Sequence, residues 1–183
     1  MYILSIDPGS EHSGIAVYDS DNHRVLRTDD VSNTSLLGTI RNWDSSQWSI
    51  PGAVMAIEGL ENQGHFVGRS TFDTAEWIGR FREAWEVSGR KSYKISRRDV
   101  KTVMCGGSTY RDPDTGAQKT VKDAQVNQAV RSRFPATGGG KRPEVGTKAQ
   151  KGPLYGVKGS HQYSAIAIAL TCMEIHGRKE GTQ

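Results

Sequence analysis

The sequence predicts an α/β protein built around a mixed sheet. Residues 2–7 and 14–19 have the composition of two strands joined by the turn-rich stretch PGSEHS, and a third strand is expected at 23–28. Residues 53–57 are a continuous apolar run of the kind found in buried strands. Strands that come first and then alternate with helices indicate a sheet covered by helical layers.

Helices are expected wherever apolar residues recur at helical spacing. The clearest case is 71–87, where the apolar stripe is Phe72, Ala75, Ile78, Phe81 and Trp85. The last helix, 162–176, is apolar on nearly every side and should be buried against the sheet. The other expected elements are helices at 32–43 and 120–134, a short strand at 92–96, and loops at 105–119 and 135–160.

The composition bounds the class of protein. The chain has 183 residues, of which 35% are hydrophobic, which is enough for one domain over 1–183 with a buried core. No apolar run reaches the ~20 residues that a membrane span needs, so no membrane partner is expected. Cys105 and Cys172 are far apart and lack metal-binding spacing, which favours a reduced intracellular setting.

Positive charge gathers in two places. The formal net charge is +4, and residues 138–158 hold five cations against one acid. This stretch belongs to a segment rich in Gly, Lys and Pro, about 136–160, which we call the basic loop and expect to be flexible. Arg97, Arg98 and Lys101 form a second cluster. Such clusters fit a polyanionic partner, and ordinary solvated surface charge is the simpler alternative.

Two predicted strands end in an acid. Asp7 follows Ile-Leu-Ser-Ile, and Glu58 follows Val-Met-Ala-Ile. Each acid alone has an ordinary explanation: Asp7 could cap a turn, and Glu58 could stand where the strand reaches solvent. Neighbouring buried strands would instead bring both carboxylates within reach of a metal, and a cation would relieve their repulsion. Hard oxygen ligands favour Mg2+ or Mn2+.

Four motifs occur in a characteristic order along the chain. They are SIDPGSEHSGIAVYD, AIEGLENQG, VKDAQVNQAVRSRFP and SHQYSAIAIAL. Together they resemble the motifs of RuvC-type Holliday junction resolvases, in the RNase H-like nuclease superfamily. The DPG stretch alone is a weak signal, but the likeness covers nearly the whole chain, and four motifs in order are specific.

The resemblance implies an RNase H-like fold, a mixed five-stranded central sheet flanked by helices. It implies a homodimer that binds branched DNA, a four-way junction, and hydrolyses phosphodiesters to leave two symmetric nicks. Two Mg2+ or Mn2+ ions about 4 Å apart would clamp the scissile phosphate. The implied setting is the cytoplasm of a bacterial host cell. The short chain and its Lys-rich loop look closer to the bacteriophage or prophage branch than to the main bacterial one.

The metal ligands implied by the resemblance are Asp7, Glu58 and His161. Asp7 would bridge both ions, and His161 would ligate through a neutral imidazole nitrogen at the start of the last helix. The family pattern has a second acid three residues later, where this chain has Ser164. A hydroxyl is a poor, uncharged ligand. Either a weaker site is tolerated, another acid or a water substitutes, or the chain is an inactivated variant.

The remaining expected contacts are with DNA. Lys122 matches a basic position near the family's active site, where its ammonium would hold the scissile phosphate, and a solvated lysine is the alternative. Phe66, in the loop after the second acid, would wedge between bases unless it is a buried anchor. The other residues expected to bind DNA are Arg69, Arg97, Arg98, Lys101, Lys141, Arg142, Lys148 and Lys151.

Two other functions stay open at this point. A catalytically weak relative that binds branched DNA is favoured by Ser164. A nuclease of the same fold that cuts RNA–DNA hybrids or DNA flaps is the second, although the sequence shows no motif for contacts to 2′-hydroxyls.

Overall fold

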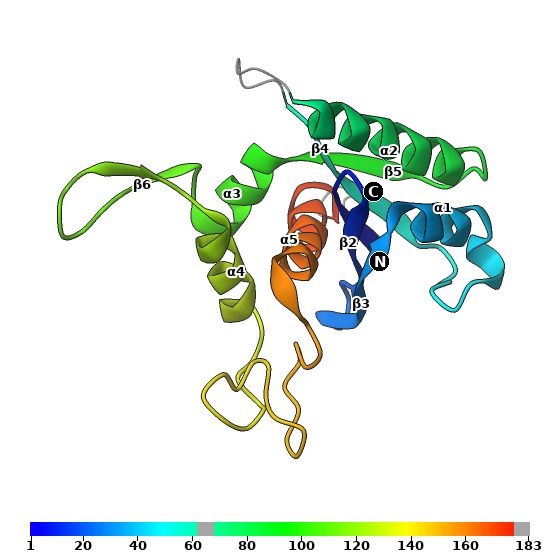
Figure 1. Cartoon of the computed structure of the whole chain (residues 1–183). Coiled ribbons are helices and arrows are strands. Elements are labelled where there is room, and N and C mark those ends of the chain that lie inside the picture. Colours follow the sequence, from blue (N-terminus) through cyan, green and yellow to red (C-terminus); the bar gives the residue numbers. More distant parts are fainter. Residues whose placement is uncertain (62–67, 178–183) are drawn as a thin grey trace.

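A mixed sheet lies at the centre of the molecule, as predicted. The computed structural model describes residues 1–61 and 68–177. Its five-stranded sheet has the order β3-β2-β1-β4-β5 (Figure 1). The strands are β1 (Tyr2–Pro8), β2 (His12–Asp19), β3 (Arg24–Ser32), β4 (Val54–Gly59) and β5 (Ser92–Ser96). The first three are antiparallel neighbours, whereas β4 runs parallel to β1 and β5 runs parallel to β4.

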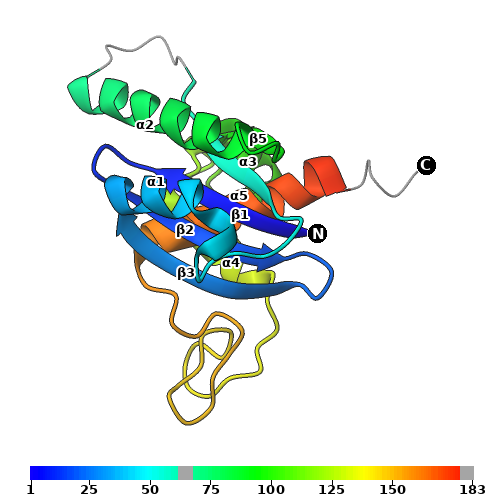
Figure 2. The same ribbon diagram turned by 90° about the vertical axis from the view of Figure 1, so that its right-hand side faces the viewer.

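Helices cover both faces of this sheet. Those described are α1 (Asn33–Arg41), α2 (Arg69–Glu86), α3 (Arg97–Cys105), α4 (Asp123–Ser132) and α5 (Gly159–His176), with a short 3-10 turn η1 (Trp43–Ser45). α1 and α2 lie on one face, and α5, with α3 and α4 beside it, lies on the other (Figure 2). No helix in these described parts of the chain is long and apolar enough to cross a membrane.

The alternation of side chains along β1 divides the core in two. Leu4 and Ile6 pack in the cluster under α1 and α2, whereas Ile3 packs in the cluster around α5. Because successive strand residues point to opposite faces, Asp7 belongs to the same face as Ile3, the α5 face. The same reasoning places Glu58 with Ala56, which also packs in the α5 cluster.

The apolar stripe predicted for 71–87 is correct in part. Ile78, Phe81 and Trp85 are buried, and the Trp85 ring meets Trp43 edge to face with 4.9 Å between ring centroids. Phe72 is instead 66% exposed. α2 covers the sheet only along its later turns, so its first turn carries an apolar side chain that faces solvent.

Between β5 and α4 the structure has a helix and a hairpin that the sequence analysis did not predict. α3 begins directly after β5 with a reciprocal cap, in which Ser96 accepts from the backbone of Asp99 and Asp99 accepts from the backbone of Ser96. The loop expected at 105–119 then holds a hairpin, β6 (Thr109–Arg111) and β7 (Gln118–Thr120), which projects away from the sheet (Figure 1). The residues of its strands lie on the surface and have no apolar alternation, which is why the sequence pattern missed them.

The basic loop contains no named helix or strand before α5, as predicted, but it has internal order. Its backbone closes on itself through hydrogen bonds such as Gly139 N–H to Gln150 O (2.9 Å) and Gly152 N–H to Val145 O (3.0 Å). Leu154 is fully buried and anchors the loop to the α5 cluster. Figure 1 shows the loop extending beyond the ends of α4 and α5.

Candidate active site

Asp7 and Glu58 lie at the ends of adjacent parallel strands. Ile6 of β1 is the register partner of Ile57 of β4, so each carboxylate comes one residue after a matched pair. Both belong to the sheet face that α5 covers, and their side chains are only 16% and 17% exposed. The sequence predicted that these two acids end neighbouring strands.

His161 joins Asp7 at this end of the sheet. Its Nδ1 lies 2.9 Å from Oδ2 of Asp7, and its side chain is 60% exposed. The close approach of α5 to β2 depends on Gly14, which is the β2 partner of Asp7. A Cβ atom at Gly14 would come within 2.4 Å of the His161 carbonyl oxygen, so only glycine lets the first turn of α5 lie this close to the strand.

Glu58 makes an ion pair that the sequence did not predict. Nη1 of Arg97, the first residue of α3, donates to Oε2 of Glu58 at 3.1 Å. Nη2 of the same guanidinium donates to Oδ1 of Asp123, the first residue of α4. One arginine therefore holds two acids from different elements, with its own side chain only 20% exposed.

Burial raises the pKa of both strand-end carboxyl groups. For Asp7 the hydrogen bond from His161 opposes this effect, and the pKa stays above its usual value. For Glu58 burial raises the pKa to about 7 despite the nearby Arg97 charge, and the charge of Asp7 adds to the rise. Both groups resist ionisation, and a bound cation would reverse this.

The described residues do not form a ready metal cage. No three His, Cys, Asp or Glu side chains within 1–61 and 68–177 are gathered closely enough to hold one ion. Asp7 and His161 contact each other, whereas Glu58 contacts Arg97. Asp7, Glu58 and His161 thus lie at the same end of the sheet without forming one cluster, and an arginine pairs with Glu58. Ser164, one turn further along α5 than His161, is 4% exposed.

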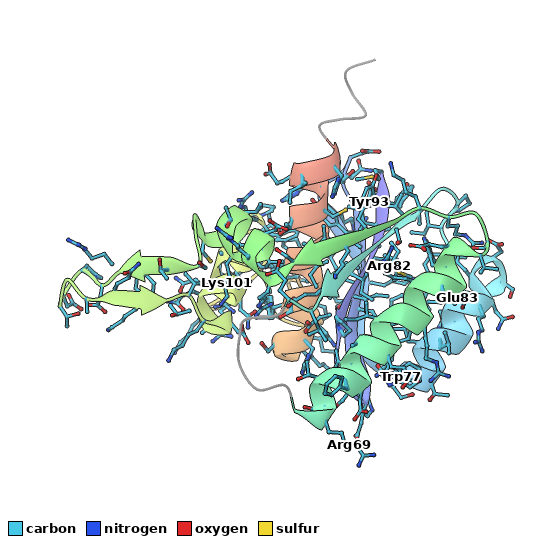
Figure 3. The ribbon with its side chains drawn as sticks, turned by 90° about the horizontal axis from the view of Figure 1, so that it is seen from above. Arg69, Trp77, Arg82, Glu83, Tyr93 and Lys101 are labelled. Carbon is cyan, nitrogen blue, oxygen red and sulfur yellow. The ribbon has the colours of Figure 1, made fainter. Side chains whose placement is uncertain are left out.

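Several of the predicted DNA-binding cations share one surface pocket. Arg97, Arg98 and Lys101 line it together with Glu61 and with Ser108 and Thr120 at the base of the hairpin. Figure 3 shows Lys101 near this base and Arg69 far from it, at the start of α2 and pointing outwards. Lys122 is exposed and precedes α4 directly.

The other predicted DNA contacts are separate from this pocket or not described. The cations at the tip of the basic loop are all exposed, and they are Lys141, Arg142, Lys148 and Lys151. Phe66 lies outside the described residues. That these residues touch DNA stays a prediction.

Sequence reasoning missed two features that shape the site: Gly14 and the pairing of Arg97 with Glu58. From the sequence, Asp123 is expected to be a spare acid near the site that makes a salt bridge, and its ion pair with Arg97 agrees with this. For Arg97 the sequence favours a DNA contact. The reciprocal cap Ser96–Asp99 was a usable signal, because it fixes where α3 begins and so where Arg97 stands. Nothing in the sequence indicated which carboxylate Arg97 would meet.

Comparison with known proteins identifies the architecture. No protein-family model matches the chain, and no curated protein matches it. The chain is similar to a structure of Thermus thermophilus RuvC in complex with a Holliday junction substrate, with a TM-score of 0.62, 18% identity, and coverage of 98% of this chain and 96% of that one. A second Thermus thermophilus RuvC structure matches with a TM-score of 0.60 and 18% identity, covering 98% of this chain and 97% of that one.

The chain has the RuvC fold. The predicted RNase H-like architecture, a mixed five-stranded sheet flanked by helices, is therefore confirmed. At 18% identity the structural similarity establishes the fold alone, so the reaction has to be argued from the residues of the site.

Proposed function

We propose that this protein is a metal-dependent, structure-selective endonuclease that cleaves four-way DNA junctions by symmetric nicking. The observation that carries the proposal is the meeting of Asp7, Glu58 and His161 at one end of a RuvC-fold sheet. The cationic pocket of Arg98 and Lys101 supports it, because Arg97, which also lines this pocket, pairs with Glu58.

The residues present fit a divalent metal. Carboxylate oxygens and an imidazole are suitable ligands for Mg2+ or Mn2+. Burial raises the pKa of Glu58 to about 7 despite the Arg97 charge, and a divalent cation bound there would favour its ionised form. The amide oxygen of Asn127 is also buried without a hydrogen-bond partner. Its amide nitrogen donates to the hydroxyl of Ser160, the residue before His161. We propose two ions per site, held by Asp7, Glu58 and His161.

Each residue of the proposed site has a separate task. When bound, the metal would polarise the scissile phosphate and lower the pKa of a water nucleophile. Asp7 is held in place by the hydrogen bond with His161 and by its position in the middle strand of the sheet. Lys101, Arg98 and Lys122 attract the DNA backbone and hold the phosphate against the carboxylates.

The wider proposal follows from the same reaction. Symmetric nicks across a two-fold junction require two active sites related by a two-fold axis, so we propose a homodimer. We place it in the cytoplasm of a bacterial host cell and, from the short chain and its basic loop, in a bacteriophage or prophage lineage.

A junction-binding protein with weak catalysis is the second candidate. Two observations favour it, the uncharged Ser164 and the Arg97 guanidinium that already neutralises Glu58. Both would lower metal occupancy without affecting the cationic surface that meets DNA.

A cleavage assay separates these functions. The parent and Asp7→Asn are given a four-way junction, a flap and an RNA–DNA hybrid of equal length, each with Mg2+ and with Mn2+. We expect paired symmetric nicks in the junction with the parent, and loss of nicking with nearly unchanged junction affinity for Asp7→Asn. Junction binding without cleavage in either metal would support the second candidate. Cleavage by Asp7→Asn within about tenfold of the parent would contradict the metal assignment.

A further inference from the structure

A positive charge from the protein itself lies among the carboxylates of the site. The Arg97 guanidinium is permanently charged, and its two terminal nitrogens contact Glu58 and Asp123 at the same time. Because both acids contact one planar fork, their oxygens are held near each other, although they come from β4 and α4. The arginine thus occupies a position where a metal would meet the same oxygens.

Asp123 is a carboxylate that the expected ligand set leaves out. It is the first residue of α4, where the helix dipole favours a negative charge, and its side chain is 61% exposed. Helix capping alone does not explain why it turns towards Arg97 and Glu58. Asn127, one helical turn later, has a buried oxygen without a partner, so this side of α4 carries oxygen atoms that can bind a cation.

Position 164 supplies no charge to the site. Ser164 is buried, and a hydroxyl adds no negative charge to the three ligands expected from the sequence. A carboxylate from another element would restore the ligand charge, and Asp123 already shares a cation with Glu58.

We propose that Arg97 is a resident counter-cation of the metal site, that a divalent ion displaces it from Glu58, and that Asp123 then supplies the carboxylate that position 164 lacks. This inference rests on the proposed metal-dependent function and adds a ligand and a switch to it. The displaced guanidinium stays in the pocket with Arg98 and Lys101, where it can bind a phosphate of DNA through two parallel hydrogen bonds. Metal binding would therefore convert Arg97 from a partner of Glu58 into a partner of the substrate.

The first test measures Mn2+ binding to the DNA-free protein by electron paramagnetic resonance, which counts free ions. We expect Asp123→Asn to weaken Mn2+ binding by about tenfold or more, because a charged ligand is removed. Arg97→Gln should bind Mn2+ at least as tightly as the parent, because a competing cation is gone.

The chain offers a matched control pair. Arg90 and Asp44 form an ion pair of 2.6 Å next to the other helical layer, and the Arg90 side chain is 20% exposed, like that of Arg97. Arg90→Gln and Asp44→Asn should leave Mn2+ binding unchanged.

The second test compares melting temperatures in EDTA and in saturating Mn2+. We expect Arg97→Gln to melt below the parent in EDTA, because two acids lose their counter-cation, and to match the parent in Mn2+. The Arg90→Gln variant should show the same deficit in both conditions, because its ion pair has no link to the metal.

Three results would overturn the inference. They are Mn2+ affinity of Asp123→Asn within about twofold of the parent, an Arg97→Gln deficit that persists in Mn2+, or no Mn2+ binding by the parent. If Asp7→Asn loses Mn2+ and Asp123→Asn does not, this inference falls while the proposed function stands. The proposed function itself is tested by the junction-cleavage assay, and neither of the two tests above depends on cleavage.

Discussion

The backbone of His161 lies against Gly14, at the point where β2 pairs with Asp7. A Cβ atom at position 14 would come 2.4 Å from the His161 carbonyl oxygen and 2.8 Å from its Cβ. One missing side chain thus decides how closely α5 approaches the sheet and brings the imidazole to Asp7.

Gly14→Ala should therefore damage the site as well as the fold. The added methyl meets backbone atoms that cannot rotate away, so we expect a loss of about 1–3 kcal/mol in unfolding free energy. Junction cleavage should fall further than stability predicts, because α5 must shift and carry His161 away from Asp7. Chemical denaturation and cleavage under folding conditions measure the two effects. Gly38→Ala, on α1 with open space around its Cβ, is the control and should be neutral or stabilising.

Glu58 should make stability depend on pH in the absence of metal. Its pKa rises from 4.5 to about 7 on folding. Between these values the folded state binds more protons than the unfolded state, so the unfolding free energy should fall as pH rises from about 4.5 to about 7 and level off above it.

Glu58→Gln tests this dependence because it removes the titrating group at nearly constant size. Denaturation curves in EDTA across this pH range should show a flatter profile for the variant. An identical slope in parent and variant would mean that Glu58 does not carry the raised pKa.

DNA binding should depend steeply on salt. Cations that neutralise phosphates release counterions, and removing one such cation should reduce the slope of log affinity against log salt concentration by about 0.9. Replacing Lys141, Arg142, Lys148 and Lys151 together by Ala should flatten the slope if the basic loop touches the junction. Arg41→Ala, on the opposite face of the sheet, is the control. A salt response that is flat in the parent gel-shift titration would rule out phosphate-dominated binding.

Dimerisation is expected to use the outer surface of α2. Trp85 is fully buried against Trp43 and donates its indole N–H to the Lys91 carbonyl oxygen at 2.9 Å, so it is not available for an interface. Phe72 and Val87 are 66% and 77% exposed, the first on this helix and the second directly after its last residue.

Phe72→Glu should then convert the dimer into a monomer. Light scattering with and without junction measures this, with Tyr155→Glu, 42% exposed on the basic loop, as the control. A parent that scatters as a single 20.1 kDa chain at micromolar concentration, even with junction present, would refute the dimer.

Restoring an acid at position 164 should raise the rate of Mg2+-dependent junction cleavage. Ser164→Asp adds one charged oxygen ligand on the turn after His161, and hard carboxylates favour Mg2+ over the softer Mn2+. We expect higher Mg2+-dependent cleavage, together with a lower melting temperature in EDTA that Mg2+ restores, because Ser164 is 4% exposed and the new charge is buried. Ser164→Asn is the uncharged control. If Ser164→Asp gains nothing in Mg2+ while the parent already cuts junctions rapidly, position 164 is not a ligand position.

The sequence alone determined the five strands of the central sheet, the long helices and the pair of strand-end acids. Apolar runs ending in Asp7 and Glu58 indicate buried strands, and the hydrophobicity of 162–176 requires a buried helix, because these patterns act over a few residues along the chain. The four ordered motifs then indicated the RuvC fold, which the comparison with solved structures confirmed.

Only the tertiary structure decided which charges meet. Arg97 is 39 residues from Glu58 and 26 from Asp123, and no local pattern connects them. Their contact depends on how α3 and α4 pack beside the sheet, and an arginine side chain is long and flexible enough to bind DNA or to turn inwards. The burial of Glu58 favours the inward orientation of Arg97, because a carboxylate largely removed from water is stabilised by a nearby positive charge.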